Sequence, residues 1–199
     1  MRKTGSALLI ALLGSAANQA FALEGTVNNW SQNGVEIGVG AGPNWTRTSI
    51  SGVGSDTETT TAWQAFLGYK FNQYATIEAG YLSAGHYSVS DSDAYVGAHL
   101  HAIQASVVGT LPITQSFGVF ARLGADYWML DVNAHDSTGS ASASAHTTEP
   151  LYGLGVQALF DGGIVRAEFQ RSEHDDTVYG YHYSLAANTL LLSVVWLIH

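Results

Sequence analysis

The chain has 199 residues, of which 12% are charged, and it contains no cysteine. This length fits one domain, and the missing cysteines exclude a disulfide scaffold and a thiolate metal site. The formal net charge of -9 argues against a nucleic-acid partner, because no basic patch is available to displace counterions from phosphates. Mean hydropathy is close to zero, so a membrane protein of this composition would be a β-barrel with alternating polar and apolar residues.

The N-terminus has the parts of a secretory signal peptide. Arg2 and Lys3 form a basic region, the short apolar run ALLIALL follows, and a small-x-small cleavage pattern ends at Ala22. We therefore predict a signal peptide over residues 1–22 and a single barrel domain over residues 23–199. The alternative is an uncleaved membrane anchor, which the short run and the good cleavage pattern do not favour.

From Gly34 onward, stretches of about ten alternating residues are separated by clusters of Gly, Asn, Asp and Ser, which is the pattern of β-strands and turns. Eight strands are predicted, near residues 35–46, 61–71, 74–83, 97–111, 117–130, 151–160, 164–172 and 187–198.

The connections between these strands alternate in length. Short turns are predicted at 72–73, 112–115 and 161–163, whereas the other connections are long and polar, and the longest, 131–149, is expected to be a mobile loop. Outer-membrane barrels have this asymmetry, with short periplasmic turns and longer external loops. The predicted fold class is all-β, an eight-stranded antiparallel transmembrane up-and-down β-barrel.

Each predicted strand has one apolar face and one polar face with many glycines. A soluble barrel such as a lipocalin also alternates, but its outer face would be rich in charge. Here the apolar face instead carries two aromatic bands, typical of the two interfaces of a membrane. The expected bands are Tyr69, Phe71, Phe117, Phe160 and Trp196 at the short-turn end, and Trp45, Trp63, Tyr81, Tyr127 and Tyr152 at the loop end. In the last strand both faces are apolar, and we expect Leu190, Leu192, Val194, Trp196 and Ile198 to face outward.

Three stretches resemble the transmembrane domain of the outer membrane protein A family: YKFNQYATIEAGY (69–81), GTLPITQSFGVFARLGADYW (109–128) and GVQALFDGGIVRAEFQ (155–170). The resemblance implies an eight-stranded barrel in the outer membrane of a Gram-negative bacterium, inserted by the outer-membrane assembly machinery and surrounded by lipid and lipopolysaccharide. Members of that family continue into a periplasmic peptidoglycan-binding domain, whereas this sequence ends at His199, so we assign no cell-wall tethering. We expect a monomer.

Nearly every ionisable residue within the strands falls on the polar, inward face, because a charge on the lipid face costs about 2–4 kcal/mol at the membrane midplane. The predicted lumen ion network consists of Glu36, Lys70, Glu78, Arg122, Asp126, Arg166 and Glu168. Glu36 and Lys70 are expected side by side on neighbouring strands. The network is interpreted as a satisfied polar core, or alternatively as a gate in which Glu78 switches between basic partners.

The resemblance bears on the gate alternative. It implies that Glu78 and Arg166 match two gate residues of the family. The position of the partner lysine, however, is Val108 here, and that of a second glutamate is Gln157. Half of the switch is therefore missing.

Two further patterns bear on catalysis or metal binding. His182-Tyr183-Ser184 resembles the His-x-Ser pair of the lipid A 3-O-deacylase, but it does not fall on the penultimate strand and has no obvious acidic partner. His99 and His101, with other histidines, have side chains that bind metals, yet solvated loop histidines are the simpler interpretation. We predict no enzymatic activity, no metal and no cofactor.

Two function classes remain. In the first, a structural barrel carries a crown of surface loops that recognises host molecules, phage or other cells, with contacts at Tyr87, Tyr95, Tyr179, Tyr181 and Tyr183. In the second, the barrel is a narrow ion or water pore. A small barrel is filled by its own side chains. Bulky residues are expected inward here, namely Phe66, Leu82, Phe120, Trp128 and Leu159. A closed or nearly closed lumen is therefore predicted.

Overall fold

The computed structural model describes Trp30 and residues 32–50, 54–91, 94–136, 139–178 and 181–198. The predicted signal peptide lies outside these residues, so its cleavage after Ala22 stays a prediction. Side chains are not described at the strand tips, over 48–50, 54, 56, 86–91, 94–96, 134–136, 139–141, 174–178 and 181–185. In the described part of the chain no helix has the length and apolar character needed to cross a bilayer.

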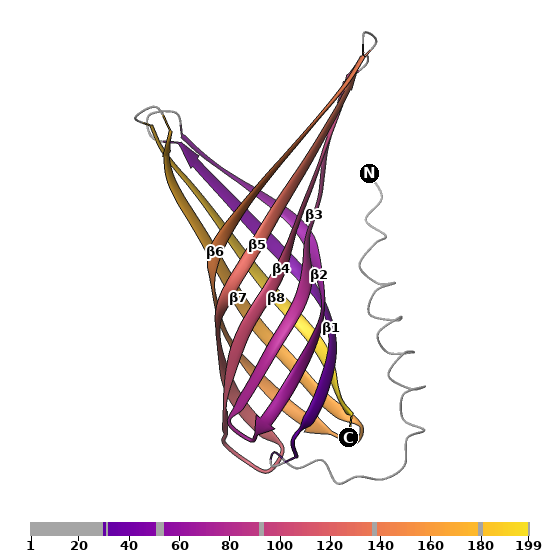
Figure 1. Ribbon diagram of the computed structural model, residues 1–199, viewed down its shortest axis with the longest axis vertical. Coiled ribbons are helices and arrows are strands. Elements are labelled where there is room, and N and C mark those ends of the chain that lie inside the picture. The colour runs from indigo at the N-terminus through magenta and orange to yellow at the C-terminus, as the bar shows by residue number, and fades with distance from the viewer. Residues whose placement is uncertain are drawn as a thin grey trace.

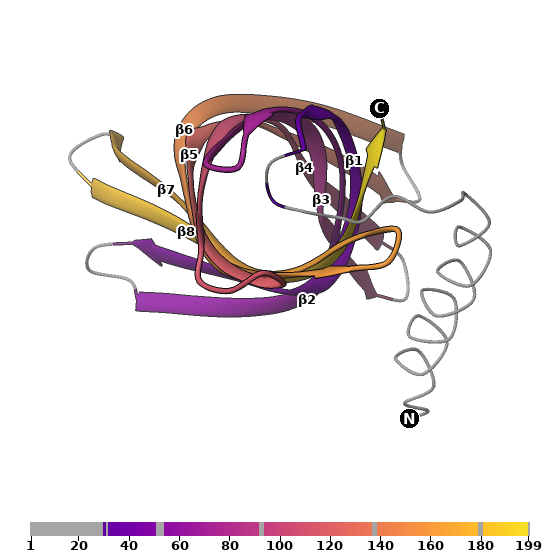
Figure 2. The same ribbon diagram turned by 90° about the horizontal axis from the view of Figure 1, so that it is seen from below.

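Eight antiparallel strands form one closed barrel, in which each strand pairs with its sequence neighbours and β1 pairs with β8 (Figures 1 and 2). The predicted fold class is confirmed. The strands are β1 (Gly34–Ile50), β2 (Gly54–Asn72), β3 (Ala75–Asp91), β4 (Ala94–Pro112), β5 (Phe117–Asp136), β6 (Gly139–Phe160), β7 (Gly163–Val178) and β8 (Tyr181–Ile198).

The strands are longer than the sequence predicted, and most of the expected long loops are strand. The prediction of a loop over 131–149 is wrong, because β5 and β6 continue there as a hairpin in unbroken register, with Asp131 opposite Ser144. Apolar residues no longer alternate with polar ones in this stretch, so the sequence pattern resembled a loop. Two paired strands can nevertheless form without a hydrophobic core on either face, because their ladder satisfies backbone donors and acceptors of both strands.

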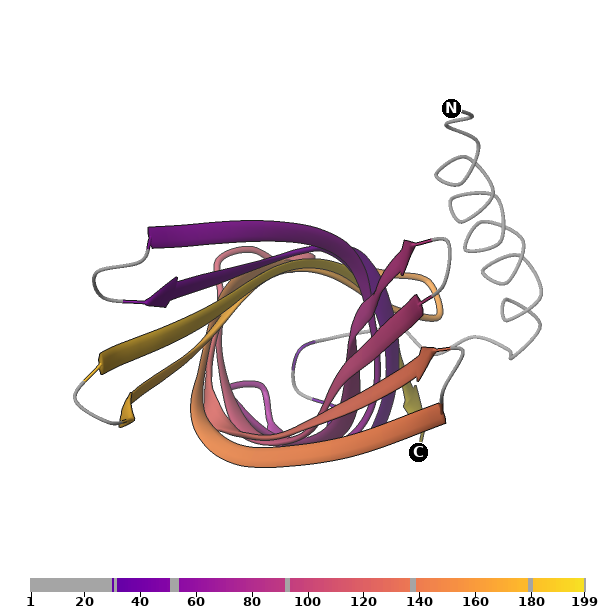
Figure 3. The same cartoon turned by 90° about the horizontal axis from the view of Figure 1, so that it is seen from above.

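At the long-hairpin end the barrel divides into two sheets. Pairing between β2 and β3 ends at Trp63 and Ser83, and pairing between β6 and β7 ends at Leu151 and Ser172, whereas the other six ladders continue toward the strand tips. We call the outer parts of β3, β4, β5 and β6 the first arm, and those of β7, β8, β1 and β2 the second arm. Figures 1 and 3 show the two arms diverging from the barrel.

A different local feature accompanies each of the two openings. On β3 the register with β4 shifts between Ser83 and Gly85, and Gly85 has a φ of 117°, which only glycine adopts readily and which is typical of a bulge that bends a strand. On β6 the feature is Pro150. The backbone N–H of Leu159 donates toward β5, to the Ser116 carbonyl. Because N–H groups alternate in direction along a strand, the N–H groups of the even-numbered residues of β6 point toward β7. Proline has no N–H, so at Pro150 the hydrogen bond to β7 is missing.

The faces of the strands follow the predicted parity. On β8, Leu190, Leu192 and Ile198 are exposed on the outer wall, while Leu191 and Val195 are buried inside. The predicted register of the last strand is therefore confirmed. Most of the aromatic residues of the two predicted bands are likewise exposed on the outer wall: Tyr69, Phe71 and Phe117 at one end and Trp63, Tyr81, Tyr127 and Tyr152 at the other.

Candidate functional site

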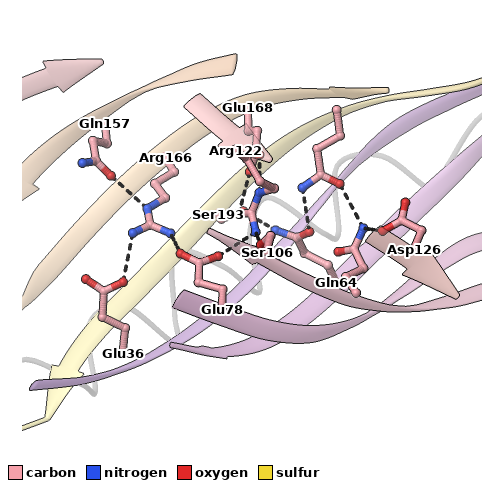
Figure 4. Close-up of polar contacts among 12 residues, drawn as sticks. Glu36, Gln64, Glu78, Ser106, Arg122, Asp126, Gln157, Arg166, Glu168 and Ser193 are labelled. Carbon is pink, nitrogen blue, oxygen red and sulfur yellow. Dashed lines mark hydrogen bonds and ion pairs between the residues drawn. The ribbon is translucent and has the colours of Figure 1, made fainter. Parts of the chain in front are cut away.

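Five charged residues meet inside the barrel and form a buried ion cluster: Glu36, Glu78, Arg122, Arg166 and Glu168 (Figure 4). They come from β1, β3, β5 and β7, and each is at most 4% exposed. Alternation places all of them inward, because each lies on the polar parity of its strand.

Arg166 uses every guanidinium nitrogen in this cluster. Its Nε donates to Gln157 Oε1 at 2.9 Å, its Nη2 to Glu36 Oε2 at 3.0 Å, and its Nη1 to Glu78 Oε1. One side chain of β7 is thereby tied to β6, β1 and β3. Such charge-assisted contacts are the strongest hydrogen bonds that side chains make.

Arg122 forms the second half of the cluster. Its Nε and Nη2 donate to the two carboxylate oxygens of Glu168, at 2.6 and 3.0 Å, in the bidentate geometry that guanidinium favours. Its Nη1 donates to Ser106 Oγ and also lies 2.8 Å from Glu78 Oε2. Glu78 is therefore held by both arginines at once, rather than by one of two alternative partners.

Two phenylalanine rings pack beside the guanidinium groups. Arg166 lies 5.7 Å from the ring centroid of Phe66 and 5.6 Å from that of Phe120, within the range of a cation–π contact. Glycine makes room for both rings. A Cβ on Gly38 would lie 2.1 Å from Phe66, and one on Gly155 would lie 2.5 Å from Phe120.

Lys70 is buried, and the β1–β2 register places it opposite Gly34, diagonal to Glu36, on the neighbouring strand as predicted. The ion pair of Glu36 is with Arg166. The Lys70 ammonium lies 5.6 Å from the ring centroid of Trp30. Trp30 is buried at the short-turn end, and its Nε1 donates to the Thr114 carbonyl at 3.0 Å. Sequence reasoning missed Trp30, because it precedes β1 and belongs to no alternating pattern.

Asp126 belongs to a second polar layer, closer to the arms. Asp126 Oδ1 accepts from Gln104 Nε2 at 3.1 Å, and the same nitrogen lies 3.3 Å from Gln170 Oε1. Gln170 donates to Gln64 at 3.2 Å, and Gln64 to Ser193 at 3.5 Å. We call these five residues the amide layer (Figure 4). Gln64 and Gln170 were not among the predicted site residues, although both have inward parity.

Above the amide layer, apolar side chains fill the interior just below the arms. Leu82, Trp128 and Leu191 are each at most 6% exposed, and they pack with small alanines from neighbouring strands. Phe66 and Phe120, also expected inward, are buried lower down, and Leu159 is partly buried beside them.

The gate residues implied by the resemblance are only partly present. Val108 is fully buried and lies opposite Arg122 in the β4–β5 register. The second cation that contacts Glu78 in this structure is Arg122. Gln157, at the position of the second glutamate, accepts from Arg166 and donates to Thr110.

The remaining candidates lie outside this interior. His101 stacks on Tyr81 with ring centroids 5.7 Å apart and lies near Asp131. Among the residues that the structure describes, no cluster of three or more metal-ligating side chains occurs. Tyr179 and the side chains of the other predicted contacts, and those of the His-x-Ser pair, lie outside the described part: Tyr87, Tyr95, Tyr181, Tyr183, His182 and Ser184.

The chain is similar in sequence to curated outer membrane proteins. The chain is 30% identical to outer membrane protein A of Serratia marcescens over 85% of its own length and 49% of that protein. It is 29% identical to the Shigella dysenteriae protein over 82% of its length and 44% of that protein. The chain thus spans about half the length of these relatives.

Two solved structures share the fold. Ail, the attachment invasion locus protein of Yersinia pestis, crystallised with the heparin analogue sucrose octasulfate, has a TM-score of 0.55 at 15% identity, covering 82% of this chain and 99% of Ail. Neisserial surface protein A has a TM-score of 0.55 at 17% identity, covering 81% and 97%. At this identity the likeness concerns the fold alone.

The model of the OmpA-like transmembrane domain matches residues 30–183, which is most of the barrel. Together with the relatives, this match gives the compartment: the protein lies in the outer membrane of a Gram-negative bacterium, among lipid and lipopolysaccharide. The chain belongs to the OmpA-like transmembrane domain family.

Proposed function

We propose that this protein is a surface-recognition barrel: a monomer, inserted by the outer-membrane assembly machinery, whose arms bind an extracellular partner and whose lumen is closed to solutes. The observation that carries the proposal is the extension of all eight strands beyond the aromatic band into two separate sheets. A rigid scaffold that holds exposed elements away from the surface is a common arrangement for binding. Catalysis has no part in this function.

The contents of the lumen support its closure. From the periplasmic mouth outward, the interior holds Trp30 with Lys70, the ion cluster, the amide layer, and the apolar layer around Trp128. Eight-stranded barrels have interiors that side chains fill. We therefore expect the purified barrel to give no steady porin-sized conductance in planar bilayers. A steady conductance in the unmodified protein would contradict closure.

A narrow, gated pore is the second candidate, and Glu78 is the observation that favours it. Its carboxylate lies between Arg122 and Arg166, so a small displacement would leave it bound to either one. Arg166→Ala then serves as the test. A gate predicts that this variant conducts cations steadily, whereas a structural cluster predicts only a less stable barrel.

The charge of the arms bears on the partner. At or beyond the openings the strands contain more acidic residues than basic ones: the acidic ones are Asp56, Glu58, Asp91, Asp131, Asp136, Glu149, Glu173, Asp175 and Asp176, and the basic ones are Arg47 and Arg171. Ail was crystallised with a polyanion. The acidic arms here disfavour a polyanion and favour a cationic or neutral partner.

Two trimmed variants of equal size test the role of the arms. Removing 132–143 shortens the first arm above the Asp131–Ser144 pair, and removing 174–185 shortens the second above the Glu173–Ala186 pair; each gap is closed by Asn-Gly, a favoured hairpin turn. Cells displaying each variant, and one with both deletions, are screened against purified extracellular-matrix proteins and phage. We expect the double variant to fold and lose recognition. Recognition that survives both deletions would assign binding to the β1–β2 and β3–β4 hairpins, and recognition that also survives the trimming of these two would refute the proposal.

A further inference from the structure

We infer that the outer edge of β6 in the first arm is a docking edge that takes up an extended polypeptide segment as an added strand. This inference deepens the proposed surface-recognition function and depends on it. The open β6 edge is defined as the side of Gly139–Glu149 that faces away from β5 (Figures 1 and 3).

The backbone of this edge has the chemistry that an extended chain recognises. Over Gly139–Glu149, β6 pairs with β5 on one side, and pairing with β7 has already ended at Leu151. Since Leu159 donates toward β5, the even-numbered residues, Ser142, Ser144 and His146 among them, direct their N–H groups to the open side. A row of unpaired N–H and C=O groups is a template for another strand.

The side chains of β6 leave that template accessible. The sequence from Gly139 to Glu149 is GSASASAHTTE, without Lys, Arg, Asp or Pro, and its one acidic residue, Glu149, lies at the base of the edge and is buried. Ser142, Ala143 and Ser144 are exposed, and their small size leaves space on both faces of the sheet for side chains of an incoming strand. Edge strands are usually blocked by charges, proline or bulges. This one has its proline only at its base, where Pro150 separates it from β7.

The other three edges at the openings are less available. On β3, the edge begins at the bulge of Gly85, and at its base the Ala84 carbonyl already accepts from Thr60 Oγ1 of β2 and Asn44 Nδ2 of β1, so side chains close the base of that opening. Farther out, β2 carries the exposed Glu58. On β7, the exposed Glu173 forms an ion pair with Arg171. These contacts and charges make β6 the edge best suited to an added strand.

Charge selects the kind of segment. Arg171 and Glu173, on the β7 side of the opening, form an ion pair and compensate each other. The acidic character beside β6 therefore comes from the exposed Asp131 on the neighbouring β5 and from the other acidic residues of the arms. The segment that fits is therefore extended and basic, with small or β-branched residues between its cationic ones.

A synthetic peptide tests the docking edge on the full chain in lipid nanodiscs. The probe is a ten-residue peptide of alternating Lys and Thr with blocked termini. We expect binding to slow the hydrogen exchange of backbone amides at Ser142, Ser144 and His146. The same peptide with N-methyl groups on alternate amides loses ladder hydrogen bonds and should bind at least about tenfold more weakly, which corresponds to about 1.4 kcal/mol.

A matched pair of variants tests which edge is used. Ser144→Pro removes one outward N–H from the open edge, while Ser144→Ala removes only the hydroxyl. Proline is tolerated on edge strands, and retained heat-modifiable mobility on gels reports that the barrel has folded. We expect Ser144→Pro to weaken peptide binding by about tenfold and Ser144→Ala to leave it unchanged.

Several outcomes would overturn the inference: no binding at millimolar peptide, protection confined to β2 or β7, or equal binding by the Ser144→Pro variant. Equal binding of a Glu–Thr peptide would overturn the basic preference. The proposed function fails separately. If the trimmed arms abolish cell recognition while Ser144→Pro does not, the arms recognise a partner by another surface, and only the docking edge is refuted.

Discussion

The barrel interior and the two arms are built from the same strands, but different contacts hold them. Inside, the single side chain of Arg166 on β7 contacts Gln157 on the neighbouring β6 and also reaches Glu36 on β1 and Glu78 on β3, which are not neighbours of β7. In the arms the described contacts lie mainly within one sheet, such as Arg47 with Ser55 or Arg171 with Glu173. Each strand is therefore joined to several other strands by side-chain contacts inside the barrel, and to few of them in the arms.

The difference shows where sequence changes are tolerated. In the interior, a buried charge depends on partners from other strands, so losing one side chain leaves others unsatisfied. In the arms, an exposed side chain meets mostly water, and exposed ion pairs contribute little to stability. Variation that changes recognition can accumulate in the arms without unfolding the barrel.

The sharpest test of this contrast compares two arginines of β7. Arg166→Ala leaves Glu36 and Glu78 with fewer partners and should lower the free energy of unfolding by about 3–5 kcal/mol. Arg171→Ala breaks only an exposed pair and should cost at most about 1 kcal/mol. Urea unfolding in lipid vesicles measures both. Equal effects of the two substitutions would mean that the interior is not the more strongly coupled region.

A second pair uses two glycines. Gly155→Ala places a Cβ 2.5 Å from both Phe120 and the Ala167 carbonyl, whereas Gly109→Ala meets its nearest atom at 4.0 Å. We expect the first to destabilise the barrel by about 1–3 kcal/mol through overpacking, and the second to be nearly neutral. Unfolding midpoints measured side by side decide it, and an unaffected Gly155→Ala variant would show that both the ring of Phe120 and the β7 backbone at Ala167 shift to make room.

A smaller effect is expected at the periplasmic mouth. Trp30→Ala loses the hydrogen bond to Thr114 and the ring beside Lys70, and should cost about 1–2 kcal/mol. Trp30→Phe keeps a ring and loses only the hydrogen bond, so it should cost about half as much. Chemical unfolding of both variants measures this order. Stability unchanged in Trp30→Ala would argue that Trp30 contributes nothing to the closed end.

The smallest effect is expected at the base of the β6 edge. Pro150→Ser restores an N–H that points toward β7, so the β6–β7 ladder should lengthen at Glu173 while overall stability changes by less than about 0.5 kcal/mol. Hydrogen exchange at position 150 and at Glu173 reports the added pairing. Fast exchange of the new amide would show that something other than the missing donor separates the arms.

Alternation along the strands was enough to predict the strand count, the two faces and the inward position of every charged residue in the ion cluster. Period-two patterning determines on which side a residue lies, but it does not determine which residue it meets. The contact of Arg122 with Glu78 crosses the lumen between β3 and β5, so neighbouring-strand reasoning could not find it.

The arms were missed for a different reason. In segments such as 139–149 the alternation is Ser with Ala rather than polar with apolar, and these segments are strands because their hairpin partner is already in register. Each of the two openings is accompanied by one residue of special backbone chemistry, Gly85 or Pro150. Such residues are visible in a sequence, but they are informative only once the neighbouring strands are known.

The two arms also differ in whether their strands are consecutive in the sequence, and this difference affects the order in which they assemble. The first arm is continuous in sequence, from β3 to β6, so its hairpins require only local loop closure and can form early. The second arm joins β7 and β8 to β1 and β2, so it needs both ends of the domain to have met. Its formation coincides with the final closure step. A probe on the second arm would therefore report completed insertion, while one on the first arm would respond earlier.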